Sequence, residues 1–427
     1  MKIVIKQVNL CKRRLIMPKV NIKKEQFDFL DWELGVFFHF GIRTFYEGHV
    51  DWDMKEMPLS GFNPPEVDCD NWIKTVKEAG AKYAILVCKH HDGFANWPSK
   101  YTEYSVKNTP WLDGKGDVVR LFVDACRKYD IKVGLYYSPA QFGSNDMDGK
   151  EYDDYFINQI SELLTNYGKI DYLWFDGCGS EGHEYDTARI VKAIRSCQPN
   201  ILIFNMWDPD TRWIGNESGV APLCNKNILT ELSGFSINMA DGDKLENERF
   251  LPAECDVTIR AKNWFYSDSD GHTLKSLDEL MGLYYASVGR GANLLVNIGP
   301  GRDGKLPEAD AKRYIEFGKK VKEIFSEKYE AKGTVEKSEN GFNIVFDDFE
   351  KVNHIVLCEE IDGESEIEDF EIRCFARPHQ GKVIAYHGET VGHKRICAFP
   401  TMDAKKIEVV LDKDKKIDIK AYYIPRF

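Results

Sequence analysis

Polar residues with acid, base or hydrogen-bonding chemistry follow short apolar runs along the first three quarters of the chain. They are His39, His90, His91, Asp176, Asn205, Asp208 and Asn297. Imidazole, carboxylate and amide groups bind hydroxyl-rich ligands, and the first two also transfer protons. If the apolar runs are parallel strands, these groups gather at the carboxyl edge of one sheet. In a (β/α)8 barrel that edge is the rim where active sites are built.

Two carboxylates of this set suggest a reaction. Asp176 ends the run IDYLWFDG before a glycine-rich turn, and strand alternation places Trp174 on the same face. Glu217 follows 41 residues later (217 − 176) in the polar loop DPDTRWIGNESG. Carboxylates on neighbouring rim loops could hydrolyse a glycosidic bond, one as nucleophile and the other as acid and base. Taken alone, Glu217 is better explained as a solvated loop residue, and Glu254 in PAECDV is its nearest rival.

The histidines allow two interpretations. His39, His90 and Asp176 could hold a metal ion in a barrel hydrolase, but the first apolar run lacks the paired H-x-H ligands of such sites. Neutral imidazoles instead serve as donors and acceptors for sugar hydroxyls, which is the favoured interpretation. Adjacent strand residues point to opposite sides, so His90 and His91 also predict irregular backbone. We expect no metal.

A glycine motif at 299–304 invites a dinucleotide-binding interpretation. The segment GPGRDG satisfies G-x-G-x-x-G and follows an apolar run. Such a motif opens a nucleotide-binding unit, whereas this one closes the α/β region, and no strand ending in an acidic residue follows it. We therefore expect a barrel-closing loop and no cofactor.

The elements that must position these residues alternate in type. Apolar runs at 35–40, 83–91, 131–138, 170–177, 201–208 and 293–300 predict buried parallel strands. Amphipathic stretches at 117–130, 152–168, 187–198 and 307–325 predict helices, the first with Val118, Leu121, Phe122 and Ala125 on its buried face. Short alternating runs then predict an antiparallel sandwich. The fold class expected is α/β, a (β/α)8 TIM-like barrel over 1–325 and a C-terminal β-sandwich over 326–427.

Composition excludes several partners. The 427 residues carry a formal net charge of −12, which argues against a nucleic-acid binder. No apolar run is long enough to span a bilayer, and the basic amino terminus lacks the features of a secretory signal. Eleven scattered cysteines without a C-x-x-C pair indicate reduced thiols. A cytoplasmic location without membrane contact is expected, with the oligomeric state open.

Seven stretches in family order resemble the α-L-fucosidases of glycoside hydrolase family 29. They are FFHFGIRTF, KHHDGFANWPSKYTEYSVKNTPW, GDVVRLFVDACRKYDIKVGLYYSP, DYLWFDG, RWIGNESG, ECDVTIRAKNWFY and LLVNIGPGRDGKLPE. The resemblance implies a retaining enzyme acting on fucosylated glycans, with Asp176 as nucleophile and Glu217 as acid/base. The sugar-binding residues that we expect are His39, Asp51, Trp52, His90, His91, Tyr136, Trp174, Arg212 and Trp264.

The motif R-W-x-G-N-E-x-G resembles the branch that releases α-1,3- and α-1,4-linked fucose. Two departures concern this finer assignment, because Ala140-Gln141 and Asp51-Trp52 stand where relatives tend to have Trp-Asp and Glu-Trp. An inactive carbohydrate-binding protein and a metal-dependent barrel hydrolase remain the alternatives. Turnover of an aryl fucoside distinguishes a fucosidase from an inactive carbohydrate-binding protein. Metal analysis distinguishes it from a metal-dependent hydrolase.

Overall fold

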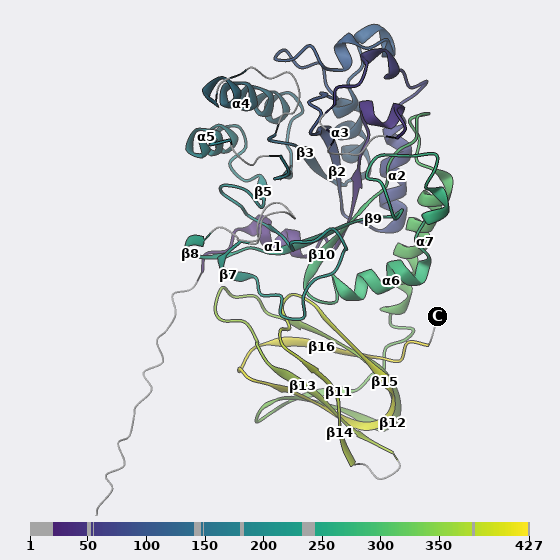
Figure 1. Ribbon diagram of the computed structural model, residues 1–427. Coiled ribbons are helices and arrows are strands. Elements are labelled where there is room, and N and C mark those ends of the chain that lie inside the picture. Colours follow the sequence, from purple (N-terminus) through teal and green to yellow (C-terminus); the bar gives the residue numbers. More distant parts are fainter. Residues whose placement is uncertain are drawn as a thin grey trace, which may run out of the picture.

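A barrel of eight parallel strands forms the larger part of the molecule (Figure 1). The computed structural model describes residues 20–48, 53, 55–140, 147, 149–179, 183–232, 244–377 and 381–425. The strand order is β5-β4-β3-β2-β1-β10-β9-β6. A parallel bridge between Phe204 and Thr211 joins the two edges, so the sheet is nearly closed. The predicted (β/α)8 barrel is confirmed. Its strands are β1 (Leu34–Phe38), β2 (Tyr83–Lys89), β3 (Lys132–Tyr137), β4 (Tyr172–Phe175), β5 (Leu202–Phe204), β6 (Arg212–Trp213), β9 (Ala253–Thr258) and β10 (Ala292–Asn297).

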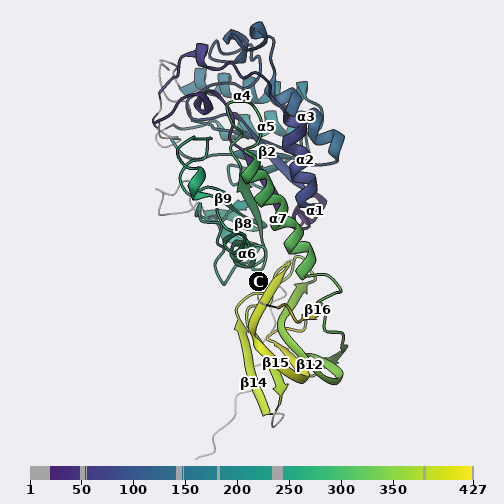
Figure 2. The ribbon, with the colours of Figure 1, turned by 90° about the vertical axis from the view of Figure 1, so that its right-hand side faces the viewer.

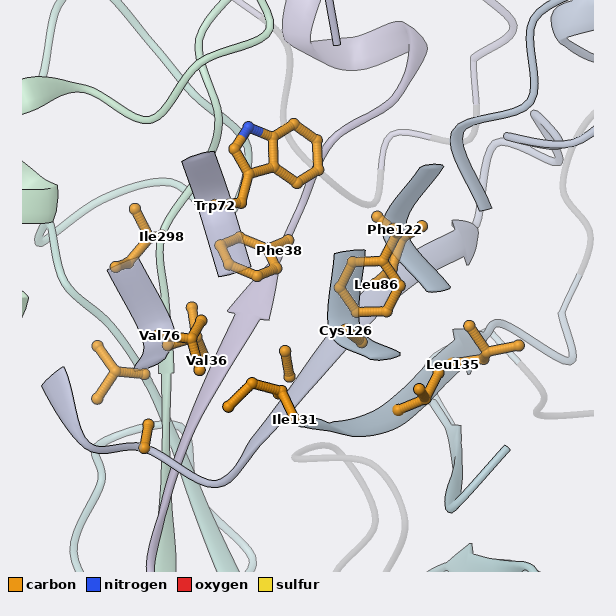
Figure 3. Packing of buried hydrophobic residues seen from close by; sticks show 14 of the residues in the cluster. Val36, Phe38, Trp72, Val76, Leu86, Phe122, Cys126, Ile131, Leu135 and Ile298 are labelled. Atoms are coloured by element: carbon orange, nitrogen blue, oxygen red, sulfur yellow. The ribbon is translucent and has the colours of Figure 1, made fainter. Parts of the chain in front are cut away.

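Helices cover the outside of the barrel. Aspartate caps open three of them, as in α2, where the Asp68 carboxylate accepts from the Asn71 backbone N–H. Figure 3 shows the apolar layer between strands and helices, in which Val36 and Phe38 of β1 lie near Trp72 of α2. The helices are α1 (Lys24–Leu30), α2 (Cys69–Ala79), α3 (Val118–Tyr129), α4 (Gly149–Asn166), α5 (Thr187–Cys197), α6 (Leu277–Ala286) and α7 (Glu308–Ile324), with short 3-10 helices at Ile42–Phe45, Leu59–Gly61, Val106–Asn108, Trp111–Gly114 and Gly271–Thr273.

Two details of the sequence prediction are corrected. Leu121 was expected on the buried face of α3 but is 41% exposed, because the buried face is centred on Val119, Phe122 and Val123. Strands β6 and β9 were not predicted. The first has two residues, and the second carries Glu254 and Asp256 inside an otherwise apolar run. Charged residues that point into a barrel break the apolar pattern on which strand prediction depends.

The C-terminal strands build the predicted sandwich (Figure 2). Strands β12 and β15 are long, and shifts in their pairing register let them bend. Each of them joins two of the runs that were expected to be separate strands. The antiparallel strands are β11 (Thr334–Ser338), β12 (Gly341–Glu359), β13 (Phe370–Ala376), β14 (Gly381–Gly388), β15 (Arg395–Leu411) and β16 (Ile417–Tyr422), and a hairpin of β7 (Ile228–Glu231) and β8 (Lys244–Phe250) lies outside both sheets.

The sandwich meets the barrel at the amino ends of the strands. Lys394 forms an ion pair with Glu33, which directly precedes β1. The backbones of Arg395 and Arg290 form an isolated antiparallel β-bridge, just before β10. Phe29 of α1 packs against Tyr83 and Tyr172 at the same end of the barrel interior. These contacts leave the carboxyl rim free for a ligand. No helix in the described part of the chain is long and apolar enough to cross a membrane.

Candidate active site

Asp176 follows β4 at the carboxyl rim and is held by three groups. The Tyr136 hydroxyl donates to Asp176 Oδ2 at 2.7 Å, and the Cys178 backbone N–H donates to Oδ1 at 2.9 Å. His91 Nε2 lies 3.4 Å from Oδ2. Burial alone would raise the pKa of Asp176, but the charge and hydrogen bond of His91, with the two other donors, lower it. Asp176 is therefore ionised at neutral pH.

His91 reaches Asp176 because the backbone is irregular at the end of β2. The pairing of β2 with β3 shifts register between Val87 and Lys89, and the rings of His90 and His91 lie 4.3 Å apart. The irregularity expected from adjacent histidines is thus present. His91 Nδ1 lies 2.7 Å from Ser138 Oγ, which orients the ring. Burial lowers the pKa of His91, yet the Asp176 carboxylate outweighs burial and raises it to about 9.

Aromatic rings line the barrel interior beside this carboxylate. The rings of Tyr136 and Trp174 stack with centroids 5.4 Å apart, and Phe37 lies 5.3 Å from Trp174. The Trp264 ring comes from the loop after β9 and lies 5.0 Å from the ring of His39. Such rings offer flat apolar faces to a sugar, which has C–H groups on one side and hydroxyls around its edge.

His39 and His90 supply polar groups to the same part of the rim. The rings of His39 and His90 lie 5.6 Å apart, and His90 stacks on Tyr136. His39 Nδ1 lies 2.8 Å from Asn297 Oδ1, and the Asn297 amide donates to the Trp264 carbonyl at 2.7 Å. Asn297 therefore orients His39 and the Trp264 loop together, in keeping with its place at the carboxyl end of β10.

A second buried carboxyl group lies below Trp174. Glu254 is 1% exposed and accepts hydrogen bonds from the Tyr83 hydroxyl at 2.6 Å and the Trp174 indole at 2.8 Å. Tyr172 adds a longer bond of 3.3 Å. Burial raises the pKa of Glu254 to about 7 in spite of these donors. Glu254 thus supports the aromatic floor from within the barrel.

Glu217 lies on the loop that follows β6 and is exposed. The loop is bounded by Gly215 and Gly219, whose φ angles of 90° and 70° favour glycine. Arg212, at the start of β6, has a different environment. It donates to Asn225 and to the Lys226 carbonyl, and none of its described contacts joins it to Asp176.

Asp51 and Trp52 lie outside the described residues. Asp53, which follows them, is held by Arg43, whose guanidinium lies between Asp92 (2.9 Å) and Asp53 (2.7 Å). Its guanidinium also donates to the Lys55 carbonyl at 3.1 Å. Arg43 therefore anchors the residues that directly follow these two expected sugar contacts.

The donor set at the rim suits hydrogen bonding better than metal ligation. His90, His91 and Asp176 each offer an atom within 4.8 Å of the others. Metal ligation requires the neutral imidazole, so a metal ion would have to displace the proton that the Asp176 carboxylate stabilises on His91. The same protonated ring is instead a good partner for the carboxylate.

An ionised carboxylate among aromatic rings at the rim of a barrel is the arrangement of a glycoside hydrolase. The chain belongs to the alpha-L-fucosidase family, whose model matches residues 16–323. Alpha-L-fucosidase 1 of Arabidopsis thaliana is 32% identical over 93% of this chain and 87% of its own length. The family inferred from the sequence motifs is thereby confirmed.

Solved structures agree with this family. A glycoside hydrolase 29 family member from an unknown rumen bacterium is 32% identical, with a TM-score of 0.85 over 96% of this chain and 78% of its own. A glycoside hydrolase 29 fucosidase of Ruminococcus gnavus, solved in complex with fucose, is 25% identical, with a TM-score of 0.79 over 95% of both chains. The chain is accordingly a glycoside hydrolase with the barrel and sandwich of its relatives.

Proposed function

We propose that the protein removes terminal α-linked L-fucose from glycans by double displacement, with retention of configuration. Asp176 is the nucleophile and Glu217 the acid/base. The observation that carries the proposal is the environment of Asp176, where His91, Tyr136 and the Cys178 N–H keep the carboxylate ionised beside an aromatic wall. A nucleophile needs this ionised state, and the wall supplies a surface for the sugar.

The proposed reaction has two steps. Asp176 attacks the anomeric carbon while Glu217 gives its proton to the departing oxygen. Glu217 then takes a proton from water, which releases fucose from the enzyme. His39 and His90, from β1 and β2, would bind sugar hydroxyls, and Trp174 would pack on the apolar face of the ring.

Chemical rescue tests both assignments through stereochemistry. In Asp176→Gly, azide should occupy the vacated space and attack an activated α-fucoside from the β face, which yields β-fucosyl azide. In Glu217→Ala the covalent intermediate still forms, so azide should yield the α-azide. Opposite anomers from the two variants support the proposal. The same anomer from both, or β-fucose as the first product of the wild type, contradicts it.

Leaving-group dependence tests Glu217 separately. Glu217→Ala should slow fucosides with poor leaving groups far more than activated aryl fucosides, because good leaving groups need little protonation. Equal losses on both substrates would move the acid/base role to another residue. Binding of fucose by the wild type without any turnover would instead favour a carbohydrate-binding protein.

We further propose a preference for α-1,3 and α-1,4 linkages, which rests on the loop sequence around Glu217. A panel of 2'-fucosyllactose, 3-fucosyllactose and the Lewis a and Lewis x sugars measures it. Faster cleavage of the branched sugars supports the preference, whereas dominant cleavage of the 1,2-linked sugar contradicts it. We also propose a cytoplasmic location. Cell fractionation with antibody detection of the protein tests it.

A further inference from the structure

Asp256 is a buried carboxylate that the proposed reaction does not use. It lies on β9 two residues after Glu254, so both side chains point into the barrel. Asp256 is 4% exposed, and the Trp213 indole N–H donates to its Oδ1 at 2.7 Å. The register β6 to β9 places Trp213 beside Glu254. Asp256 therefore lies two residues closer than Glu254 to the carboxyl rim of the barrel.

The loop that carries Glu217 runs along this part of β9. The Ile214 N–H donates to the Glu254 carbonyl at 3.1 Å. Further along the loop, a methyl group placed on Gly219 would lie 3.1 Å from the Val257 side chain. Ile214 is thus hydrogen-bonded to β9 before Asp256, Gly219 lies close to β9 after it, and Glu217 lies between these two points of the loop. The pKa of Asp256 agrees with this placement. Burial raises it most, and the negative charge of Glu217 is the next largest cause.

None of the contacts described for Asp256 brings a compensating positive charge. Its described contacts are the Trp213 hydrogen bond and repulsion from two acids, Glu217 and Glu254. On β10 the residue in register is the uncharged Leu295. Two positively charged groups, Arg212 and Arg290, act on Cys255, whose side chain points to the other face of β9.

We propose that Asp256 is a positioning residue for Glu217, and that the two carboxyl groups share one proton in the resting enzyme. This inference rests on the acid/base role proposed for Glu217. Loss of the shared proton brings two negative charges together in a partly buried site, which is unfavourable. Glu217 consequently keeps a transferable proton to a higher pH than a lone exposed glutamate would.

The proton count closes over one turnover. The shared proton passes from Glu217 to the glycosidic oxygen as the bond from that oxygen to the anomeric carbon breaks. The pair then carries two negative charges, which make Glu217 a stronger base. Water then attacks the anomeric carbon of the fucosyl ester. Its oxygen forms the new bond, the bond from Asp176 to that carbon breaks and frees the Asp176 carboxylate, and one water proton returns to the pair.

Asp256→Asn tests the proposal, because asparagine keeps an oxygen for Trp213 but removes the charge and the titration. We expect the basic limb of kcat/KM against pH, measured on a fucoside with a poor leaving group, to move down by about one pH unit. The acidic limb should stay in place. Glu254→Gln is the matched control, another buried acid on the same strand and face. It removes only the weaker of the two repulsions that act on Asp256 and leaves the Asp256 carboxyl group in place, so it should displace the basic limb by less.

An unmoved basic limb in folded Asp256→Asn, or the same displacement in Glu254→Gln, would overturn the inference. Carboxyl carbon NMR of the wild type provides a test that does not depend on a variant. Asp256 and Glu217 should titrate in two linked steps, and two independent single steps would contradict the shared proton. Failure of Glu217 itself is recognised separately, since Glu217→Ala would then show equal losses on good and poor leaving groups.

Discussion

Tyr136→Phe removes one hydrogen bond from the proposed nucleophile and little else. The buried Tyr136 hydroxyl donates to Asp176 at 2.7 Å. A hydrogen bond to a charged group contributes about 1.5–3 kcal/mol, and one pKa unit corresponds to about 1.4 kcal/mol. The pKa of Asp176 should therefore rise by about one to two units. Its side chain is 26% exposed, so water compensates in part and the lower end is expected.

The assay is the pH dependence of kcat/KM on an aryl α-L-fucoside. Because Asp176 must be ionised to attack, the acidic limb should move to higher pH by about one unit. Tyr137→Phe is the matched control. Tyr137 is the next residue of β3, is equally buried, and donates to Gln159 Oε1 at the same 2.7 Å. Its loss should lower stability without moving the acidic limb.

The reasoning fails if folded Tyr136→Phe keeps the acidic limb of the wild type. It also fails if Tyr137→Phe moves that limb by the same amount, because the effect would then be a general one of removing a buried hydroxyl from β3. Circular dichroism and thermal unfolding of both variants establish that the comparison is made on folded protein.

Three other predictions concern the neighbouring groups. The His91 ring should titrate near pH 9 by NMR, and Asp176→Asn should lower that midpoint because the paired charge is lost. Glu254 is protonated more readily in the folded state, with a pKa of about 7 against 4.5. The free energy of unfolding should therefore fall by about 3 kcal/mol as the pH rises from 4.5 to 7, and urea unfolding of Glu254→Gln should lack this decrease. His39→Ala should lower kcat/KM roughly 2- to 13-fold through lost hydrogen bonds to the sugar. It should leave the metal content, measured by elemental analysis, unchanged, and loss of a stoichiometric metal would reverse this interpretation.

The barrel and the position of its proposed nucleophile could be predicted from local sequence. Strands β1, β2, β3, β4, β5 and β10 are apolar and covered on both faces, so each appears as a continuous apolar run. Asp176 follows such a run, and polar residues at strand ends meet at one rim whenever the strands are parallel. Helices α3, α4, α5 and α7 were predicted from periodicity with errors of a few residues at their ends, whereas α1, α2 and α6 were not predicted. Leu121 was assigned to the wrong face of α3 because both neighbouring faces carry apolar residues.

Partnerships between distant residues were decided by the tertiary structure alone. Tyr83 and Glu254 are 171 positions apart, yet they share a 2.6 Å hydrogen bond inside the barrel. His91 turns toward Asp176 because of a register shift that depends on how β3 pairs with β2. Asp256 lies beside the Glu217 loop because residues on both sides of it are attached to that loop. Sequence determines which residues stand at strand ends, whereas closure of the sheet determines which of them touch, and the protonation of these carboxyl groups depends on those contacts.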